Sequence, residues 1–491
     1  MPVCRFLGAI AIASLVFSVS CGQGPTETLT SSGHKLKIKY FYSIGGNRGY
    51  APIEAGVEAA LADYEKEPDF NFKDYVEVTG ESDDDSPAKA EINARRIRRD
   101  PDVLAVIGHG SSATTFAALP FYSEAGIPII IPNASSPSVL SIHPPGSQPS
   151  PRMASDHESP HFSNAVRLIP GDVPDQAHAM ALTIKKIWGR DQPAHAKVLL
   201  ICEDTQETGA SVYSRPICDH LNKMESRAEG GNYEVVDRTD LNKHSVESVL
   251  PILRTTKPDF VVVASYPLLA RLVLQVWHED RQREHTTRQQ VVFIMPDACL
   301  APEIRDQAQD LRKSELFQLY ITYPMNLNAP TDSCAKRNDF RAAINKQAQC
   351  QVEFHHPRCE DDDKKNLKDY GDTDQILGQI PETAEAFAYD SVLILEEAVK
   401  DCVRDGDLGR ACVGRFLQEH HAALQGLCQT YHVEKGDRLN AHYFVYYPDT
   451  SPESMKGNKW PALGSANEDD YELDSSATGQ QLRADSRNEH N

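Results

Sequence analysis

The sequence lacks several features that would assign it quickly to a common class. It has no surplus of positive charge: 50 lysines and arginines stand against 71 aspartates and glutamates, a formal net charge of −21. This balance argues against binding nucleic acid and against broad contact with anionic lipid. The chain also has no Gly-x-Ser-x-Gly elbow and no phosphate-binding loop with lysine. Neither of those enzyme classes is therefore indicated.

The N-terminus has the pattern of a secretory signal. Arg5 supplies the positive charge, and the apolar run of residues 6–19 is shorter than the ~20 residues that a membrane-spanning helix needs. Residues 18–21 resemble a bacterial lipobox, although Ser18 stands where leucine is usual. We predict a signal peptide with lipobox over residues 1–21, lipidation of Cys21 and a flexible tether over residues 22–35. The alternative is a plain secretory signal cut nearby.

The length of 491 residues exceeds what one hydrophobic core usually supports, so two lobes are expected. Strand and helix signals alternate from residue 36 to about residue 324, which predicts an α/β doubly wound architecture. The last residues are rich in Ser, Asp, Glu and Asn and poor in apolar side chains, which predicts disorder. The expected division is lobe 1 over 36–165, lobe 2 over 166–322, lobe 1 again over 323–428 with a Cys-bearing insertion at 326–378, a lobe 2 return over 429–447, and a disordered acidic tail over 448–491.

Cysteine usage fits an exported, oxidising compartment. Of the 11 cysteines, Cys4 and Cys21 fall in the leader, which leaves nine. Because nine is odd, at least one thiol stays unpaired, and Cys299 beside an apolar strand is our candidate. Sequence alone leaves the pairing open. The plausible local pairs are Cys202 with Cys218, Cys334 with Cys350 or Cys359, and Cys402 with Cys412 or Cys428.

Two short apolar strands each run into a small polar turn. Residues 103–108 precede the turn 110–115, and residues 127–131 precede the turn 133–137. A buried strand that ends in Gly, Ser or Thr and opens a helix leaves backbone N–H groups that can hold a carboxylate or phosphate. Each turn by itself is more simply explained by helix capping, for which Ser and Thr are the usual residues. Two such turns in succession predict a pocket for a small anion-bearing ligand.

The order of elements and strand-end residues resembles a known family. The matching segments are residues 106–109, residues 131–135 with Pro137, Arg167 with Asp172 and Gln176, and residues 258–261, 388–390 and 434–437. Together they resemble the type I periplasmic binding proteins, specifically the leucine/isoleucine/valine-binding family of ABC-transporter receptors, over about residues 36–447. The resemblance implies two α/β lobes, each a mostly parallel sheet flanked by helices, joined by three crossings. These lobes would close over a ligand between them.

The resemblance also implies ligand-binding residues in the first lobe. Ser112, with Ala113 beside it, lies where the family holds the ligand carboxylate by backbone N–H and hydroxyl groups. Asn133 and Ser135 match the second turn, where a backbone carbonyl and a hydroxyl take the α-amine and the carboxylate. For Ser135, simple helix capping remains the alternative.

In the second lobe, the resemblance implies an aromatic residue and an acid. Tyr266 matches an aromatic that faces the ligand, and Asp297 matches an acid that pairs with the α-ammonium. The alternatives are interlobe packing for Tyr266 and a helix N-cap for Asp297. A zwitterionic amino acid requires donors on one side and a carboxylate on the other, because buried charges must be paired. Thr208 stands where many relatives carry an aromatic, so a differently shaped ligand is possible.

Metal and enzyme chemistry are the rival hypotheses. His355, His356 and Cys359 cluster with Cys350, but their spacing fits no closed zinc site. A Ser–His pair within residues 108–112 is not expected to act, because adjacent residues at a strand end point apart. We predict no catalytic residue, no metal and no cofactor.

The sequence therefore favours an extracytoplasmic solute-binding lipoprotein of a branched-chain-amino-acid-type ABC importer. Its expected partners are an amino-acid-like ligand, a membrane permease and, through the lipid anchor, the membrane itself, with the protein a monomer. The alternative is a lipoprotein of the same fold that senses a ligand or contacts a protein, such as a cell-wall synthase, without a role in transport.

Overall fold

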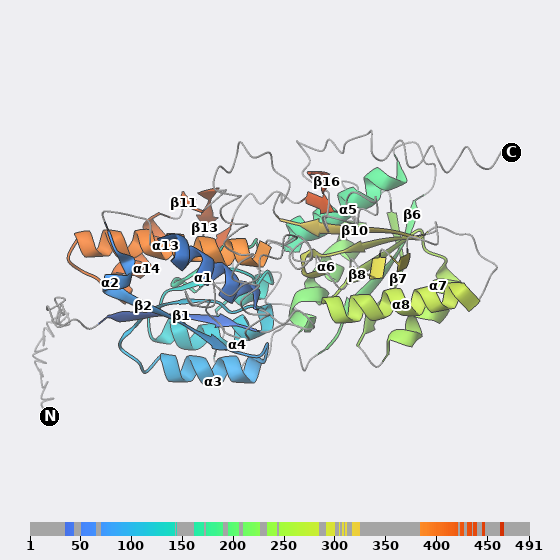
Figure 1. The fold of residues 1–491 in the computed structure, drawn as a ribbon. Helices are drawn as coiled ribbons and strands as arrows, with labels where there is room; N and C mark the ends of the chain where they lie inside the picture. Colours follow the sequence, from blue (N-terminus) through green and yellow to red (C-terminus); the bar gives the residue numbers. More distant parts are fainter. Residues whose placement is uncertain are drawn as a thin grey trace, which may run out of the picture.

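The computed structural model places about half of the chain in two α/β lobes that lie side by side (Figure 1). No helix among the described residues is long and apolar enough to cross a membrane. The described residues are 35–43, 51–64, 70–142, 144, 162–170, 173–189, 195–205, 210–225, 233–242, 245–283, 291–299, 304, 307–308, 310–311, 317–324, 383–420, 423–426, 430–434, 436–438, 444–446 and 462–465.

The first lobe is built on a parallel sheet of strand order β2-β1-β3-β4-β5. Its strands are β1 (Leu36–Tyr42), β2 (Val76–Ser82), β3 (Val103–Ile107), β4 (Ile129–Ile131) and β5 (Ala165–Arg167). Every residue of β3 and β4 is buried, as expected for a sheet covered on both faces. This explains why the two strands read as unbroken apolar runs in the sequence.

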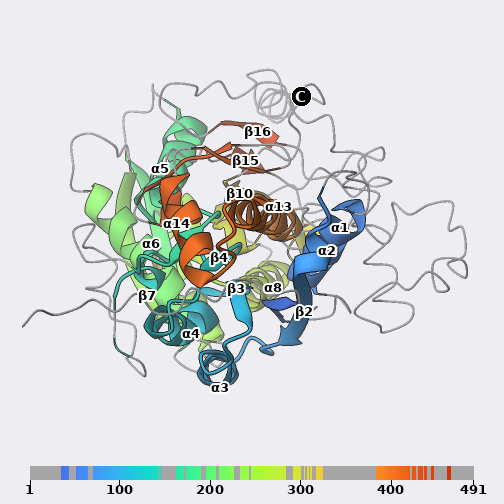
Figure 2. The ribbon, with the colours of Figure 1, turned by 90° about the vertical axis from the view of Figure 1, so that its left-hand side faces the viewer.

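Helices cover both faces of the first sheet. The pair α3 (Pro87–Ile97) and α4 (Ser112–Glu124) lies on one face, and α1 (Pro52–Tyr64) with α13 (Thr383–Arg404) lies on the other (Figure 2). The chain thus returns to the first lobe after the second is complete, because α13 packs along α1 and α14 (Arg410–Glu419) follows it. The short α2 (Phe72–Tyr75) precedes β2.

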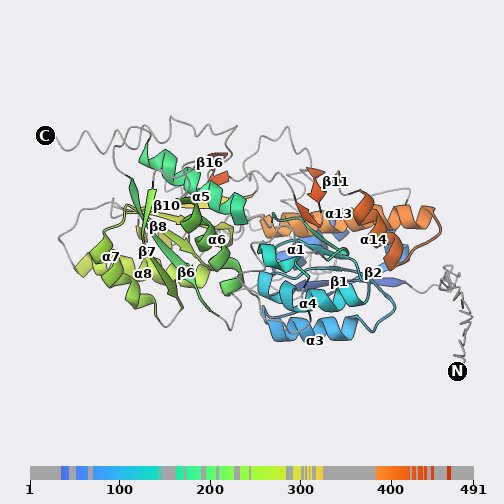
Figure 3. The same cartoon turned by 180° about the vertical axis from the view of Figure 1, so that it is seen from behind.

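The second lobe has a seven-stranded sheet of order β16-β15-β10-β9-β8-β6-β7. Its parallel part consists of β6 (Ala196–Glu203), β7 (Tyr233–Leu241), β8 (Phe260–Ala264), β9 (Val291–Met295) and β10 (Phe317–Tyr323). One apolar cluster packs α5 (Val173–Trp188) and α6 (Ala210–Glu225) on one face, and a second packs α7 (Val249–Thr256) and α8 (Pro267–Arg283) on the other (Figure 3). The chain crosses between the sheets three times: after β5, after β10, and before β15.

Three expectations about the element pattern were wrong. The expected boundary between lobe 1 and lobe 2 falls after residue 165, yet β5 (Ala165–Arg167) pairs along its whole length with β4 and closes the first sheet. The return to lobe 2, expected over residues 429–447, begins later than expected. β12 (Thr430–Tyr431) pairs with β11 (Leu424–Gln425) beside the first lobe, and β15 (Phe444–Tyr446) joins β10 in the second lobe. Sequence periodicity identifies strands but not their partners, which the three crossings decide.

The tail is the third difference. We expected disorder throughout residues 448–491, yet β16 (Ala462–Ser465) pairs antiparallel with β15. Low apolar content predicts that this segment cannot build a core alone, but an existing sheet edge supplies the backbone partners that a single added strand needs.

Two of the local disulfide pairs are confirmed. Cys202 is bonded to Cys218, tying β6 to α6, and Cys402 is bonded to Cys412, tying α13 to α14. Cys299 is a buried free thiol, as expected, and its Sγ lies 3.2 Å from the carbonyl oxygen of Ser265. The proposed pairs of Cys334, Cys350, Cys359 and Cys428 lie outside the described residues.

Candidate functional site

The candidate site lies where carboxyl ends of strands from the two sheets meet. From the first lobe, β3 leads to Ser112 and β4 leads to Ser135; from the second, β8 leads to Tyr266 and β9 leads to Asp297. The carboxyl ends of parallel strands share one edge of their sheet, which is where open α/β sheets place ligands. Contact between α4 and α6 brings the two edges together.

In the first turn, the residue that caps α4 is not the predicted ligand-binding residue. Ser111, not Ser112, is the N-cap of α4: its hydroxyl accepts from the backbone N–H of Thr114, whose own hydroxyl accepts from the backbone N–H of Ser111. This reciprocal capping box leaves Ser112 at the first position of the helix. The Ser112 hydroxyl oxygen accepts a 3.1 Å hydrogen bond from the backbone N–H of Ser136. Ala113 follows it and is buried.

Two side chains hold the second turn in place, one within the turn and one at the end of β5. The Asn133 side chain donates a 3.1 Å hydrogen bond to the carbonyl of Gly110, which ties the second turn to the first. Arg167, at the end of β5, is fully buried and donates to the carbonyls of Ala134 and Ser136. A guanidinium has five donors in a fixed plane, so it can fix two neighbouring carbonyls at once. Arg167 therefore shapes the turn that presents Ser135.

Asp297 is a buried carboxylate surrounded by neutral donors. It is only 6% exposed, its Oδ1 accepts a 2.7 Å hydrogen bond from the amide of Gln176, and the Tyr213 hydroxyl donates to the same oxygen. Burial raises the pKa of Asp297, while the bonds from Tyr213 and Gln176 act in the opposite direction. No described lysine or arginine forms an ion pair with it. The carboxylate is oriented by these donors, and no cation among the described residues balances its charge.

Tyr266 lies beside Asp297 and is fixed through its backbone and its ring. Its backbone N–H donates a 2.8 Å hydrogen bond to Glu203 at the end of β6, and its ring stacks on that of Tyr213 at 5.2 Å between centroids. Burial raises the pKa of Tyr266, and the nearby charges of Asp85, Glu203 and Asp297 raise it further. Tyr213 thus contacts both residues that the sequence placed on this side of the site.

Two contacts cross from one lobe to the other. The Ser112 hydroxyl lowers the pKa of Tyr266, and the Ser135 hydroxyl lowers the pKa of Asp297. The structure therefore brings together Ser112, Ser135, Tyr266 and Asp297, with Asn133 and Ala113 in the same two turns. Donors line the first lobe and an acid faces them from the second. Thr208 lies outside the described residues.

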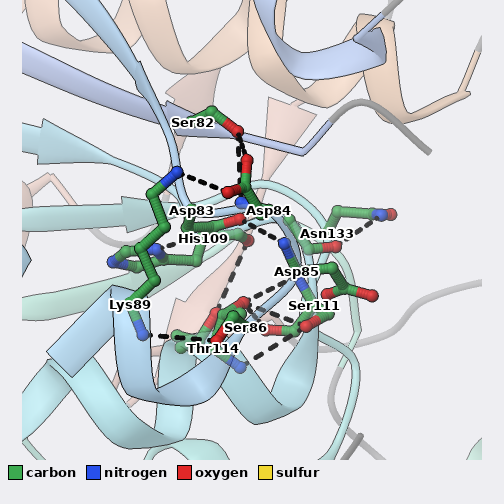
Figure 4. Close-up of polar contacts among 12 residues, drawn as sticks. Ser82, Asp83, Asp84, Asp85, Ser86, Lys89, His109, Ser111, Thr114 and Asn133 are labelled. Carbon is green, nitrogen blue, oxygen red and sulfur yellow. Dashed lines mark hydrogen bonds and ion pairs between the residues drawn. The ribbon is translucent and has the colours of Figure 1, made fainter.

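A buried network beneath the first turn accounts for His109. Its Nδ1 lies 2.8 Å from Asp83 (Figure 4). Its Nε2 lies 3.0 Å from the hydroxyl of Tyr122, and its ring stacks on Phe41 at 4.4 Å between centroids. All four side chains are buried. His109 therefore points into the lobe, away from Ser112, and a Ser–His nucleophile pair is not formed.

Within the described part of the chain, no group of three or more His, Cys, Asp or Glu side chains is placed to hold a metal ion. The cluster of Cys350, His355, His356 and Cys359, which we weighed as a zinc site, lies outside that part.

Two α/β lobes with facing strand ends and three crossings define a protein of the type I periplasmic-binding fold. The chain belongs to the family described as the receptor family ligand binding region, whose model matches residues 53–450. The recognition made from the sequence and the expected fold class are both confirmed. No curated protein matches the chain.

Solved structures share this fold at low sequence identity. A leucine-binding protein from Thermotoga maritima is 17% identical, with a TM-score of 0.60 over 88% of this chain and 99% of its own. An ABC transporter substrate-binding protein from Desulfitobacterium hafniense, in complex with Leu, is 15% identical, with a TM-score of 0.58 over 88% of this chain and 100% of its own. A solute-binding protein from R. palustris in complex with benzoate is 14% identical, with a TM-score of 0.58 over 88% of this chain and 96% of its own.

Sequence reasoning missed three residues that build the site. Glu203 is the last residue of β6, so the strand-end reasoning that found the polar turns could have found it too. Gln176 was matched to the family without a role, and here it orients Asp297. Tyr213 lies on a helix 84 residues from Asp297, and no local signal marks that contact.

Proposed function

We propose that this protein is an extracytoplasmic solute-binding lipoprotein of a branched-chain-amino-acid-type ABC importer. It binds an amino acid or a related small carboxylate between its lobes. The observation that carries the proposal is the polarity of the facing strand ends: Ser112 and Ser135 on one lobe, and the buried Asp297 on the other. A zwitterion matches this arrangement, because each of its charges meets the opposite type of group.

In this proposal each site residue has a defined task. The first turn of α4, with Ser112 and the backbone N–H of Ala113, holds the ligand carboxylate, since a helix N-terminus favours negative charge. Asn133, through its backbone carbonyl, and Asp297 take the α-ammonium. Tyr266 covers the ligand from the second lobe, and Thr208 helps to shape the space for the ligand side chain.

The mechanism is closure of two lobes over the ligand. Ligand contacts made by both lobes at once exist only when the lobes are together, so the ligand shifts the equilibrium toward the closed state. The closed surface is then presented to the membrane permease. The lipid on Cys21 anchors the protein, in the periplasm or at the outer face of the membrane, and residues 22–35 form the tether. The protein acts as a monomer, and no enzymatic step is involved.

Thermal-shift titration tests the proposal directly. A ligand that binds only the folded protein raises Tm as its concentration rises. At 100 times its Kd, such a ligand stabilises the folded state by about 2.7 kcal/mol. The panel contains amino acids, short amides and organic acids including benzoate, and at least one α-amino acid should raise Tm. If no member of the panel does so, the importer role is not supported and the protein-contact alternative is favoured.

A further inference from the structure

Of the two disulfides described above, one lies at the edge of the second sheet where the candidate site is formed. Cys202 is the residue before Glu203, the last residue of β6, and its partner Cys218 lies on α6, which packs along β6 (Figure 3). In the parallel register Cys202 lies opposite Ala264, two residues before Tyr266. Both cysteines are fully buried. The covalent link is therefore within a few residues of the site and is shielded from solvent.

A hydrogen bond joins the same two elements one helical turn away. Ser214 of α6 is buried, and its hydroxyl donates to the backbone carbonyl of Glu203. Ser214 and Cys218 are four positions apart, so their side chains leave the same face of the helix. Their partners, Glu203 and Cys202, are consecutive residues of the strand. Two links at successive turns of α6 oppose sliding or rotation of the helix relative to the end of β6.

Each of these elements also holds a predicted ligand-binding residue of the second lobe. From the strand, the Glu203 carboxylate accepts a 2.8 Å hydrogen bond from the backbone N–H of Tyr266. From the helix, the ring of Tyr213 stacks on that of Tyr266 at 5.2 Å between centroids, and its hydroxyl donates to Asp297. Tyr266 is thus held at one point by β6 and at another by α6. Its position, and that of Asp297, depends on how the strand and the helix are placed relative to each other.

The other disulfide lies at the opposite end of the strands of the first sheet. Cys402 and Cys412 join α13 to α14, and both are buried. At the start of α14, the Arg410 guanidinium donates a 2.7 Å hydrogen bond to the carbonyl of Val103, the first residue of β3. The start of α14 is therefore at the amino ends of the strands, whereas the candidate site lies at their carboxyl ends. The two bonds are similar in burial and in sequence separation, 16 and 10 residues, and differ in location.

We propose that the Cys202–Cys218 disulfide is a positioning element of the ligand site. It keeps α6 and the end of β6 at the separation at which Tyr266 and Asp297 are held. Because a binding site needs its side chains within about 0.5 Å of the productive geometry, loss of the link lowers ligand affinity as well as stability. A disulfide that served stability alone would lower only the free energy of unfolding. The inference rests on the proposed function, which assigns Tyr266 and Asp297 to the ligand.

The test removes each disulfide in turn. Cys202→Ala/Cys218→Ala deletes the bond beside the site. Cys402→Ala/Cys412→Ala is the matched control, since it deletes a buried bond of similar loop length. Urea unfolding should show that both variants are less stable than the wild type, because each loses a restriction on the unfolded chain. Cys202→Val/Cys218→Ala, which restores part of the lost volume, serves if the first variant does not fold.

Hydrogen exchange reports on the position of Tyr266 without any ligand. The amide of Tyr266, bonded to Glu203, is compared with the amide of Val262 in the middle of β8, by mass spectrometry of peptides that separate the two. In Cys202→Ala/Cys218→Ala the exchange rate at Tyr266 should rise at least about tenfold relative to the rate at Val262. The control should keep the wild-type ratio, because a loss of global stability acts on both amides alike.

Isothermal titration of the full-length proteins gives the functional readout. L-leucine is the first probe, followed by the other amino acids of the thermal-shift panel. Affinity should fall at least about tenfold in the variant without the Cys202–Cys218 bond and less than about twofold in the control.

The outcomes separate the two proposals. An unchanged affinity, an unchanged exchange ratio, or equal changes in the two variants would show that this disulfide serves stability alone. Each of these results overturns the inference while the solute-binding function stands. Failure of every amino acid to bind the wild-type protein overturns the solute-binding function and this inference with it.

Discussion

The hydroxyl of Ser135 in the first lobe faces the carboxylate of Asp297 in the second and lowers its pKa. These residues are 162 positions apart and follow β4 and β9, strands of different sheets. This interaction relates a donor-bearing turn to a buried acid at the point where the lobes meet. The binding proposal depends on this juxtaposition, and the following predictions address it.

Asp297→Ala should weaken an amine-bearing ligand by more than about tenfold, equal to ~1.4 kcal/mol or more, because the ligand ammonium would be buried without a partner. Isothermal titration with the ligand found by thermal shift measures the change. Asp407→Ala is the control, since Asp407 makes an exposed ion pair with Arg415 away from the site. Unchanged affinity in the Asp297 variant would remove Asp297 from the site.

The affinity for an amine-bearing ligand should fall in acid at a higher pH than an ordinary aspartate would give. Burial raises the pKa of Asp297, so the carboxyl takes up its proton sooner as pH decreases, and a neutral carboxyl no longer balances an ammonium. Ionised Asp297 correspondingly disfavours the folded, unliganded protein above that pKa, and a bound cation offsets this. Titrations over roughly pH 4 to 8 measure the profile. Asp297→Asn should lose most of it, and an unaltered profile in that variant would assign the titration to another group.

Tyr213→Phe should reduce ligand affinity several-fold while keeping the ring stack on Tyr266. The lost hydroxyl donates to Asp297, and a hydrogen bond to a charged group is worth about 1.5–3 kcal/mol. Removal of this donor should also move the acid limb of the pH profile upward. Tyr233→Phe provides a matched control in the same lobe: its hydroxyl is equally buried and donates to the carbonyl of Leu221 at 2.8 Å. Both variants should lose stability, but only the first should lose affinity.

Arg167→Met should lower the free energy of unfolding by about 3 kcal/mol, because two buried carbonyls lose their shared donor. Urea unfolding followed by circular dichroism measures this. Arg254→Met, at a half-exposed arginine paired with Asp280, should change stability by less than about 0.5 kcal/mol. If the two variants behave alike, Arg167 does not hold the second turn.

Lipidation is a separate prediction. Cells given radiolabelled palmitate should label the wild-type protein and not Cys21→Ala, because the proposed lipid attaches to that thiol. Detergent phase partition should follow the label. Equal labelling of both proteins would exclude Cys21 as the anchor.

The strand-end turns show how far sequence reasoning reached. The runs at residues 103–108 and 127–131 identified buried parallel strands, and the Gly/Ser/Thr turns after them identified one wall of the candidate site. The resemblance singled out Ser112, and the structure adds that its neighbour Ser111 is the helix cap, which helix geometry decides. The ligand-binding roles of these residues remain predictions.

By itself, the sequence determined what depends on local pattern: buried strands, helix starts and the polar turns that follow strands. For the disulfides it gave only candidate pairs, of which Cys202 with Cys218 is one that the structure contains. Tertiary structure alone decided which strands became neighbours, that a tail segment completes the second sheet, and that Tyr213 and Gln176 converge on Asp297. The physical reason is that periodicity and propensity act between residues close in the chain. The pairing of distant polar groups is instead set by where the three crossings place each sheet edge, and burial then requires those groups to satisfy one another.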